Sequence, residues 1–268
     1  MKLSCTSTMV PGNSLTEKAV NLGKWGYEGI AVFVDYADWS EELHQEILTL
    51  KERTGIVPCE FAFGDEIYGH LMDADPDIRR RSREMYKLAA KVSGEIGAVT
   101  ELEFEYGPQS PLPLFHPYAK MSPEQEEAFM EMYRELAEPL KGTDGKMLLE
   151  GINRYESPYL NSIRDCRDVV ERLGLKEAGV LADFFHMSIE ESDYRESILY
   201  AGEYIRHVHL GDSNRLLPGY GMTDWKACFE ALKEVGYQGF VNLECSTCGD
   251  GAVTLPKTAV FLKELIGS

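Results

Sequence analysis

The sequence predicts an α/β fold, a (β/α)8 barrel formed by a single domain over residues 1–268. Short apolar segments alternate with longer amphipathic segments along the whole chain, and eight of the short segments have the length and composition of strands. Eight strand–helix units in about 250 residues are typical of this barrel. The predicted strands are residues 3–9, 28–34, 56–64, 98–107, 146–152, 178–187, 206–212 and 239–246.

Amphipathic segments between the predicted strands carry apolar residues at spacings of three and four, which is typical of helices. Ser122 precedes Pro123 and stands three residues before Gln125, the pattern of a capping box at a helix start. A doubly wound sheet would use the same alternation, but the first predicted strand is followed by VPGNSLTE and not by a glycine-rich phosphate loop. The predicted helices include residues 40–54, 75–96, 122–140, 160–173, 224–235 and 255–266.

The composition of the chain argues against several kinds of partner and site. A formal net charge of -18 would repel polyanions, so we expect neither nucleic acid nor an anionic membrane as a partner. The first residues contain no sustained apolar stretch, and we expect a soluble cytoplasmic protein with reduced cysteines. Cys245 and Cys248 form one C-x-x-C pair without a second pair, so a structural zinc site is not expected.

Polar residues stand at the ends of four successive predicted strands: Glu150, Asp183, His209 and Glu244. The carboxyl ends of barrel strands face the active site. Each residue taken alone is more often a loop residue or a core histidine, but several inward acids around one axis need a positive charge to offset their burial. Three carboxylates and one imidazole therefore predict one divalent cation, Mn²⁺ first, with Co²⁺ or Mg²⁺ as alternatives.

His207 stands two residues before His209, so on a strand the two side chains point to the same side, with His207 one layer deeper. We therefore expect His209 to be the ligand and His207 to be a core residue or a support for the ligand.

The C-terminal half contains motifs of a known family. They are E-x-x-N-R-x-E from Glu150 to Glu156, D-x-x-H from Asp183 to His186, and H-x-H-x-x-D-S-N-R-x-x-P-G-x-G-x-x-D-W from His207 to Trp225, followed by Glu244. Over roughly residues 146 to 250, the chain resembles the xylose-isomerase-like barrels, specifically the ketose 3-epimerase group. The resemblance implies a divalent metal, usually Mn²⁺ or Co²⁺, held by the four strand-end residues.

The resemblance also implies a reaction and its residues. Glu150 and Glu244 would act as the two bases, one removing a proton next to a carbonyl and the other returning it on the opposite face. The metal would stabilise the enediolate, and the expected outcome is epimerisation of a free ketose at C3. Substrate contacts are implied for Glu156, His186 and Arg215.

The N-terminal half departs from the family pattern. Cys5 and Thr6 stand where an aromatic residue is usual, Gly151 stands where proline is common, and residues 107–121 form a loop of their own. These regions shape the pocket for the distal part of a sugar, so the identity of the sugar stays open. The expected pocket residues are Phe63, Phe115 and Tyr118.

Three alternatives remain at this point. The same metal and base could eliminate a leaving group from a 3-oxo sugar or 3-oxo-glycoside, as in barrels resembling inosose dehydratases or C-glycoside-cleaving subunits. A nuclease resembling endonuclease IV would need more histidines than six and a basic face. A noncatalytic metal-bound subunit of a complex is the third, and whether the chain forms homo-oligomers or a complex with other subunits is open.

Overall fold

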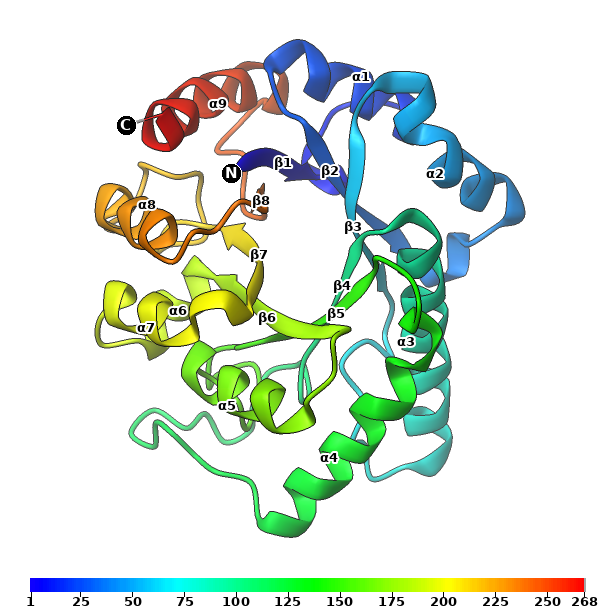
Figure 1. The fold of residues 1–268 in the computed structure, drawn as a ribbon, viewed down its shortest axis with the longest axis vertical. Coiled ribbons are helices and arrows are strands. Elements are labelled where there is room, and N and C mark those ends of the chain that lie inside the picture. The colour runs from blue at the N-terminus through cyan, green and yellow to red at the C-terminus, as the bar shows by residue number, and fades with distance from the viewer. Residues whose placement is uncertain (268) are drawn as a thin grey trace.

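The computed structural model describes residues 1–267 and confirms the predicted barrel. Eight parallel strands pair in chain order, and β1 closes the ring by pairing with β8 (Figure 1). The strands are β1 Lys2–Thr6, β2 Gly29–Asp35, β3 Val57–Gly64, β4 Val99–Leu102, β5 Lys146–Glu150, β6 Ala178–Asp183, β7 Ile205–Leu210 and β8 Phe240–Leu243.

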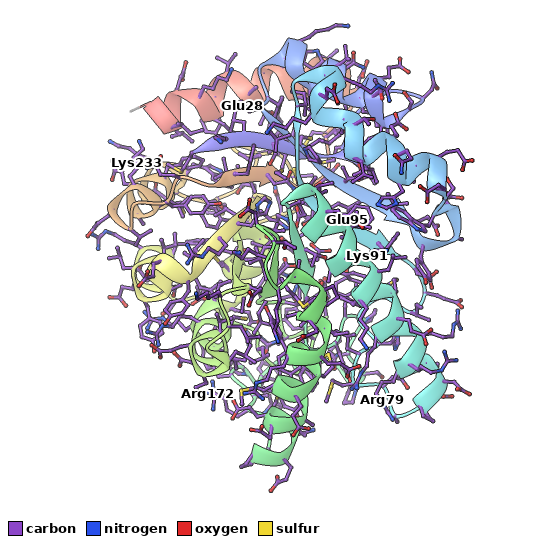
Figure 2. The ribbon with its side chains drawn as sticks, turned by 45° about the vertical axis from the view of Figure 1, so that its right-hand side comes forward. Glu28, Arg79, Lys91, Glu95, Arg172 and Lys233 are labelled. Carbon is purple, nitrogen blue, oxygen red and sulfur yellow. The ribbon has the colours of Figure 1, made fainter. Side chains whose placement is uncertain are left out.

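Helices surround the barrel on its outside, as Figure 1 shows. Of these, α9 packs beside α1 and α8 and so completes the ring. Charged side chains such as Lys91 and Arg172 lie on this outer layer (Figure 2). The helices are α1 Leu15–Trp25, α2 Glu41–Thr54, α3 Pro76–Ile96, α4 Pro123–Leu136, α5 Ile163–Leu173, α6 Phe184–Glu190, α7 Tyr194–Ala201, α8 Trp225–Glu234 and α9 Gly251–Gly267.

Local sequence signals fix where several elements begin. The predicted capping box is present at α4, where the Ser122 hydroxyl accepts from Gln125 N–H and the Gln125 side chain accepts from Ser122 N–H. The predicted strand 178–187 ends early because the Asp183 carboxylate accepts the N–H groups of Phe185 and His186 and thereby starts α6. This cap also places a carboxylate at the mouth of the barrel.

The strand predicted at 98–107 is also shorter in the structure, since β4 ends at Leu102. Beyond it, the Glu103 side chain bonds the hydroxyls of Tyr68 and Tyr86. Helices α1, α6 and α7 were not among the predicted segments. Within residues 1–267, no helix combines the length and apolar character needed to cross a bilayer.

Candidate metal centre and active-site pocket

The four strand-end residues meet at the carboxyl end of the barrel. Glu150 is the last residue of β5, Asp183 is the last residue of β6, and Glu244 directly follows β8. The backbone of Asp183 is in register with that of His209 on β7. His209, Asp183 and Glu150 are buried, and 23% of the Glu244 side chain is exposed.

The distances among these side chains suit a shared cation. His209 Nδ1 lies 3.2 Å from Glu244 Oε2 and 3.9 Å from Glu150 Oε1. Ligand atoms of Asp183, His209 and Glu244 all lie within 4.8 Å of one another. The buried Nδ1 of His209 has no hydrogen-bond partner, although carboxylates surround it. An unpaired nitrogen among carboxylate oxygens is a donor set that fits a divalent metal such as Mn²⁺.

Arg215 lies beside the same carboxylates. Its Nη1 donates to Asp183 Oδ2 and its Nη2 donates to Glu244 Oε2, both at 2.8 Å. The backbone of Arg215 is left-handed, with φ of 59°. The Arg215 N–H donates to the Asp212 carbonyl oxygen at 2.8 Å, so the turn after β7 fixes the position of this cation.

Asp212 organises that turn. Its buried carboxylate accepts N–H groups from Ser213, Gly219 and Thr223. It also accepts the indole N–H of Trp225 at 2.9 Å. The polar stretch after β7 thus has an internal hydrogen-bond centre, as expected for a preorganised loop.

His186, on α6, presents one ring nitrogen to the site. Its Nδ1 accepts the Asn153 backbone N–H at 3.2 Å, so in the neutral ring Nε2 carries the hydrogen. Nε2 lies 3.7 Å from Asp183 Oδ2 and 3.4 Å from Arg215 Nη1. Burial lowers the pKa of His186, which favours the neutral ring and a donor N–H at the site.

Glu150 and Glu244 differ in their electrostatic surroundings. Burial raises the pKa of Glu150 well above its ordinary value, and the nearby Glu101 adds to this effect. Burial acts in the same direction on Glu244, but Arg215 and His209 outweigh it, so the pKa of Glu244 is lowered. In the metal-free protein, one carboxyl group therefore favours its protonated form and the other favours its ionised form.

Two buried acids that sequence reasoning missed, Glu101 and Glu103, lie on the β4 side of the site. Glu101 and Glu103 are both buried, and the Tyr68 hydroxyl contacts both, at 2.6 Å from Glu101 Oε1. The Tyr86 hydroxyl donates to Glu103 Oε2 at 2.9 Å. Burial raises the pKa of Glu103 to about 7 and raises the pKa of Glu101 well above its ordinary value. The available signal was the alternation of acids at 101, 103 and 105 in a predicted strand.

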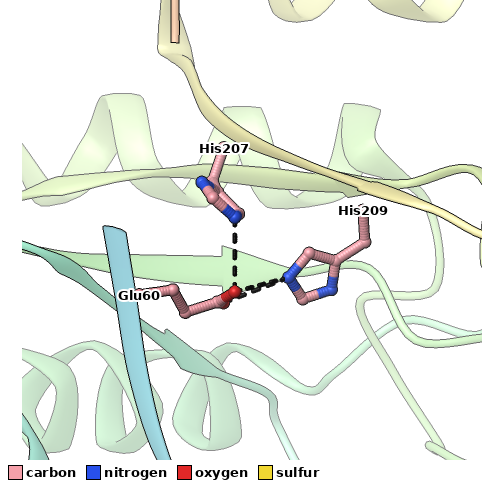
Figure 3. Close-up of side chains that lie close together, drawn as sticks. All are labelled: Glu60, His207 and His209. Atoms are coloured by element: carbon pink, nitrogen blue, oxygen red, sulfur yellow. Dashed lines mark hydrogen bonds and ion pairs between the residues drawn. The ribbon is translucent and has the colours of Figure 1, made fainter. Parts of the chain in front are cut away.

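Glu60, on β3, is a third buried acid that sequence reasoning missed. It is fully buried, and its Oε2 lies 2.9 Å from His209 Nε2 and 3.2 Å from His207 Nε2 (Figure 3). Glu60 is the one charged residue within β3, and that isolation was the available sequence signal. His207 and His209 thus contact one shared carboxylate.

A cavity of about 190 Å³ opens over this centre. One side of it carries Glu150, His186, Arg215 and Glu244 from the β5–β8 half of the barrel, together with Ile152. The other side comes from β2 to β4 and the loops that follow β3 and β4, and it carries Phe33, Phe63, Gly64, Tyr68, Glu101, Glu103 and Tyr106. A larger groove of about 500 Å³ lies at the surface beside α5 and contains none of the four strand-end residues.

Only one of the three predicted pocket residues, Phe63, lies at the cavity. Phe63 lines the cavity, whereas Phe115 is 87% exposed and Tyr118 is 53% exposed, and neither lines it. The structure therefore does not bring Phe115 and Tyr118 to the cavity. Tyr106 lines it instead, because the Tyr106 N–H is tied to the Gly69 carbonyl oxygen at the start of the loop.

Glu156 also lies outside the residues that line the cavity. Its carbonyl oxygen accepts the Gly107 N–H at 2.8 Å, and its own N–H donates to the Asn153 carbonyl oxygen at 2.9 Å. Its charge acts on the pKa of His186 in the direction that raises it. In this structure Glu156 thus anchors the loop after β4 and acts on the site through His186.

The fold and this site define the class of protein. Residues 20–265 match the family model described as xylose isomerase-like TIM barrel. The chain therefore belongs to the xylose isomerase-like TIM barrel family.

Its relatives carry the names of sugar epimerases. The chain is 28% identical over 228 residues to a Synechocystis sp. protein named "Probable ketose 3-epimerase", covering 82% of this chain and 75% of that protein. It is 31% identical over 185 residues to the D-psicose 3-epimerase of Ruminiclostridium cellulolyticum, covering 65% and 59%. The match to the D-psicose 3-epimerase of Enterocloster bolteae is 37% identical over 111 residues and spans 37% of that protein.

Solved structures show the same fold. The D-psicose 3-epimerase of Clostridium cellulolyticum H10, determined with D-tagatose, superposes with a TM-score of 0.83 at 22% identity over 99% of both chains. A 3-keto-D-glucoside 4-epimerase from E. coli superposes with a TM-score of 0.83 at 24% identity, covering 98% of this chain and 99% of that one.

Proposed function

We propose that this chain is a divalent-metal-dependent sugar epimerase that inverts C3 of a free ketose. The names of its relatives support the reaction class. One observation in the chain carries the proposal: Glu150 and Glu244 reach a single cavity from two strands, β5 and β8, and both approach His209 Nδ1. A pair of carboxyl groups placed in this way can exchange a proton with both faces of one carbon.

Each residue of the site has a separate role in the proposed reaction. Glu150, Asp183, His209 and Glu244 would hold the metal, which when bound would supply Lewis-acid polarisation of the substrate carbonyl. One of the two glutamates takes the proton from the reacting carbon, and the other delivers a proton from the opposite side. Mn²⁺ is the metal we propose, because the donor set has three carboxylates and one imidazole.

Arg215 and His186 would act on the oxygen atoms of the substrate. The Arg215 guanidinium is fixed by two carboxylates and faces the cavity, so it can stabilise a developing oxyanion without reorganising. The His186 Nε2–H supplies a further neutral donor. Phe63, Tyr68 and Tyr106 on the opposite wall would contact the distal part of the sugar.

The test uses metal-stripped protein that is reloaded with Mn²⁺ and incubated with free ketoses in D₂O. We expect deuterium at C3 and appearance of the epimer by NMR, and we expect neither in Glu150→Gln or Glu244→Gln. Wild-type protein that binds Mn²⁺ but exchanges no C3 proton on any ketose would contradict the proposal.

The panel also needs 3-keto-glycosides. One relative, 36% identical over 96 residues, is named 3-dehydro-D-guloside 4-epimerase. Epimerisation at C4 of such a compound, in place of C3 of a ketose, would keep the two bases and change the substrate. An unsaturated or cleaved product would instead assign the protein to the lyases.

A further inference from the structure

Glu60 lies below the proposed metal centre and on the far side of the barrel from β7. It is separated from His209 by 149 residues in sequence, and it is fully buried on β3. Its carboxylate contacts His209 Nε2 at 2.9 and 3.1 Å through Oε2 and Oε1. These contacts join β3 to β7 at the depth of the metal-binding imidazole.

The chemistry of the pair fixes which nitrogen carries the hydrogen. An ionised carboxylate can only accept, so the contact with Glu60 requires a hydrogen on His209 Nε2. In the neutral ring this leaves the lone pair on Nδ1, the nitrogen that faces Glu244 and Glu150 and has no hydrogen-bond partner. A ligating histidine commonly donates its other N–H to a carboxylate, which orients the ring and selects its tautomer.

His207 faces Glu60 from a second direction, in a close contact that does not have hydrogen-bond geometry. Its Nε2 lies 3.2 Å from the same Oε2 atom, and its ring meets that of His209 at 86° with centroids 5.3 Å apart (Figure 3). A buried carboxylate between two imidazoles has a restricted position. None of Glu60, His207 and His209 lines the cavity, so this cluster lies behind the centre that faces the cavity. Its ligand atoms are also close enough to share an ion, which the test below must distinguish from support of His209.

We propose that Glu60 is a positioning residue that sets the orientation and tautomer of His209, and that His207 keeps Glu60 in place for this task. The inference rests on the proposed function in one respect, because it takes His209 to be a metal ligand through Nδ1. It adds a residue from the N-terminal half of the barrel to a centre whose ligands all come from β5 to β8.

The test is Mn²⁺ affinity, measured by calorimetric titration of chelator-treated protein. Glu60→Leu removes the acceptor, and we expect binding to weaken by about 100-fold. Glu60→Gln keeps an oxygen acceptor without the charge and should recover part of this loss, ending about 10-fold weaker than wild type. Glu103→Gln is the matched control, because Glu103 is equally buried but bonds tyrosines, and its Mn²⁺ affinity should equal that of wild type.

A second measurement does not depend on a variant that folds. In ¹⁵N-labelled wild-type protein loaded with diamagnetic Zn²⁺, two-bond ¹H–¹⁵N spectra should show the His209 hydrogen on Nε2. A hydrogen on Nδ1 would overturn this inference and leave the proposed function standing. The same follows if Glu60 variants that are folded by circular dichroism bind Mn²⁺ as tightly as wild type. Wild-type protein that binds no Mn²⁺ would instead overturn the metal centre on which both proposals depend.

Discussion

The two walls of the cavity use the same side chain, a buried glutamate, in opposite ways. On the β5–β8 side, Glu244 is paired with Arg215 and His209, which lower its pKa and favour its ionised form. On the β3–β4 side, Glu101 and Glu103 contact tyrosine hydroxyls, and burial raises their pKa values. In both places burial acts to raise the pKa of the carboxyl group, and at Glu244 the positive charge of Arg215 outweighs it, whereas the neutral tyrosine hydroxyls at Glu103 do not.

A proton count on the β3–β4 wall supports this contrast. The Tyr68 hydroxyl has a single hydrogen, yet its oxygen contacts carboxyl oxygens of both Glu101 and Glu103. One of the two carboxyl groups must therefore supply the second hydrogen. This wall thus presents less charge to a substrate than its residue types suggest, whereas the β5–β8 wall presents the ion pair of Glu244 and Arg215 beside Glu150, whose pKa is raised.

The largest expected effect comes from Glu244→Gln, because it removes a proposed base from the charged wall. We expect kcat/KM for a ketose to fall by about 10³-fold, the scale of a lost general base. The same substitution on the other wall, Glu103→Gln, should lower kcat/KM less than tenfold. Steady-state kinetics of both Mn²⁺-loaded variants would show whether the walls differ, and equal losses would refute the contrast.

Arg215→Lys tests the cation of the charged wall. The Arg215 guanidinium spans Asp183 and Glu244 with two nitrogens, which a single ammonium group does not reproduce. We expect kcat to fall by about 10²-fold with a smaller change in KM, since the lost contact is made to developing charge. A variant that keeps kcat within threefold of wild type would show that the fork geometry is dispensable.

The pH dependence of stability tests the tyrosine-bonded wall. The pKa of Glu103 is about 7 in the folded chain and ordinarily 4.5, so between these values only the unfolded chain releases its proton. The free energy of unfolding should therefore decrease by roughly 3 kcal/mol as pH rises from 4.5 to 7 through this group. Urea unfolding of chelator-treated protein should show a flatter pH profile for Glu103→Gln than for wild type. Parallel profiles would contradict the assignment.

The smallest effect is expected at the loop after β4. Phe115→Ala changes a side chain that is 87% exposed and does not line the cavity, so kcat/KM should stay within twofold of wild type. Phe63→Leu is the comparison, since Phe63 lines the cavity and contacts Phe61 and Trp39. A large rise in KM for Phe115→Ala would show that the loop closes over the substrate.

The β5–β8 wall could be predicted from the sequence, but on the other wall only Phe63 was predicted. Glu150, Asp183, His209 and Glu244 each stand at the end of an apolar run, and strand order alone brings such ends together. Glu60 lies in the middle of its strand, and its partner His209 is 149 residues away, so its role depends on pairing across the barrel. Phe115 was a candidate as a loop aromatic, but sequence does not set the direction in which a loop side chain points.

The metal centre is tested most directly by anomalous scattering from a crystal of this protein soaked in Mn²⁺. We expect one strong peak bounded by Glu150, Asp183, His209 Nδ1 and Glu244, with Glu60 still bonded to His209 Nε2. A peak that excludes His209, a peak between Glu60 and His207, or saturating Mn²⁺ without a peak at this centre would contradict this expectation.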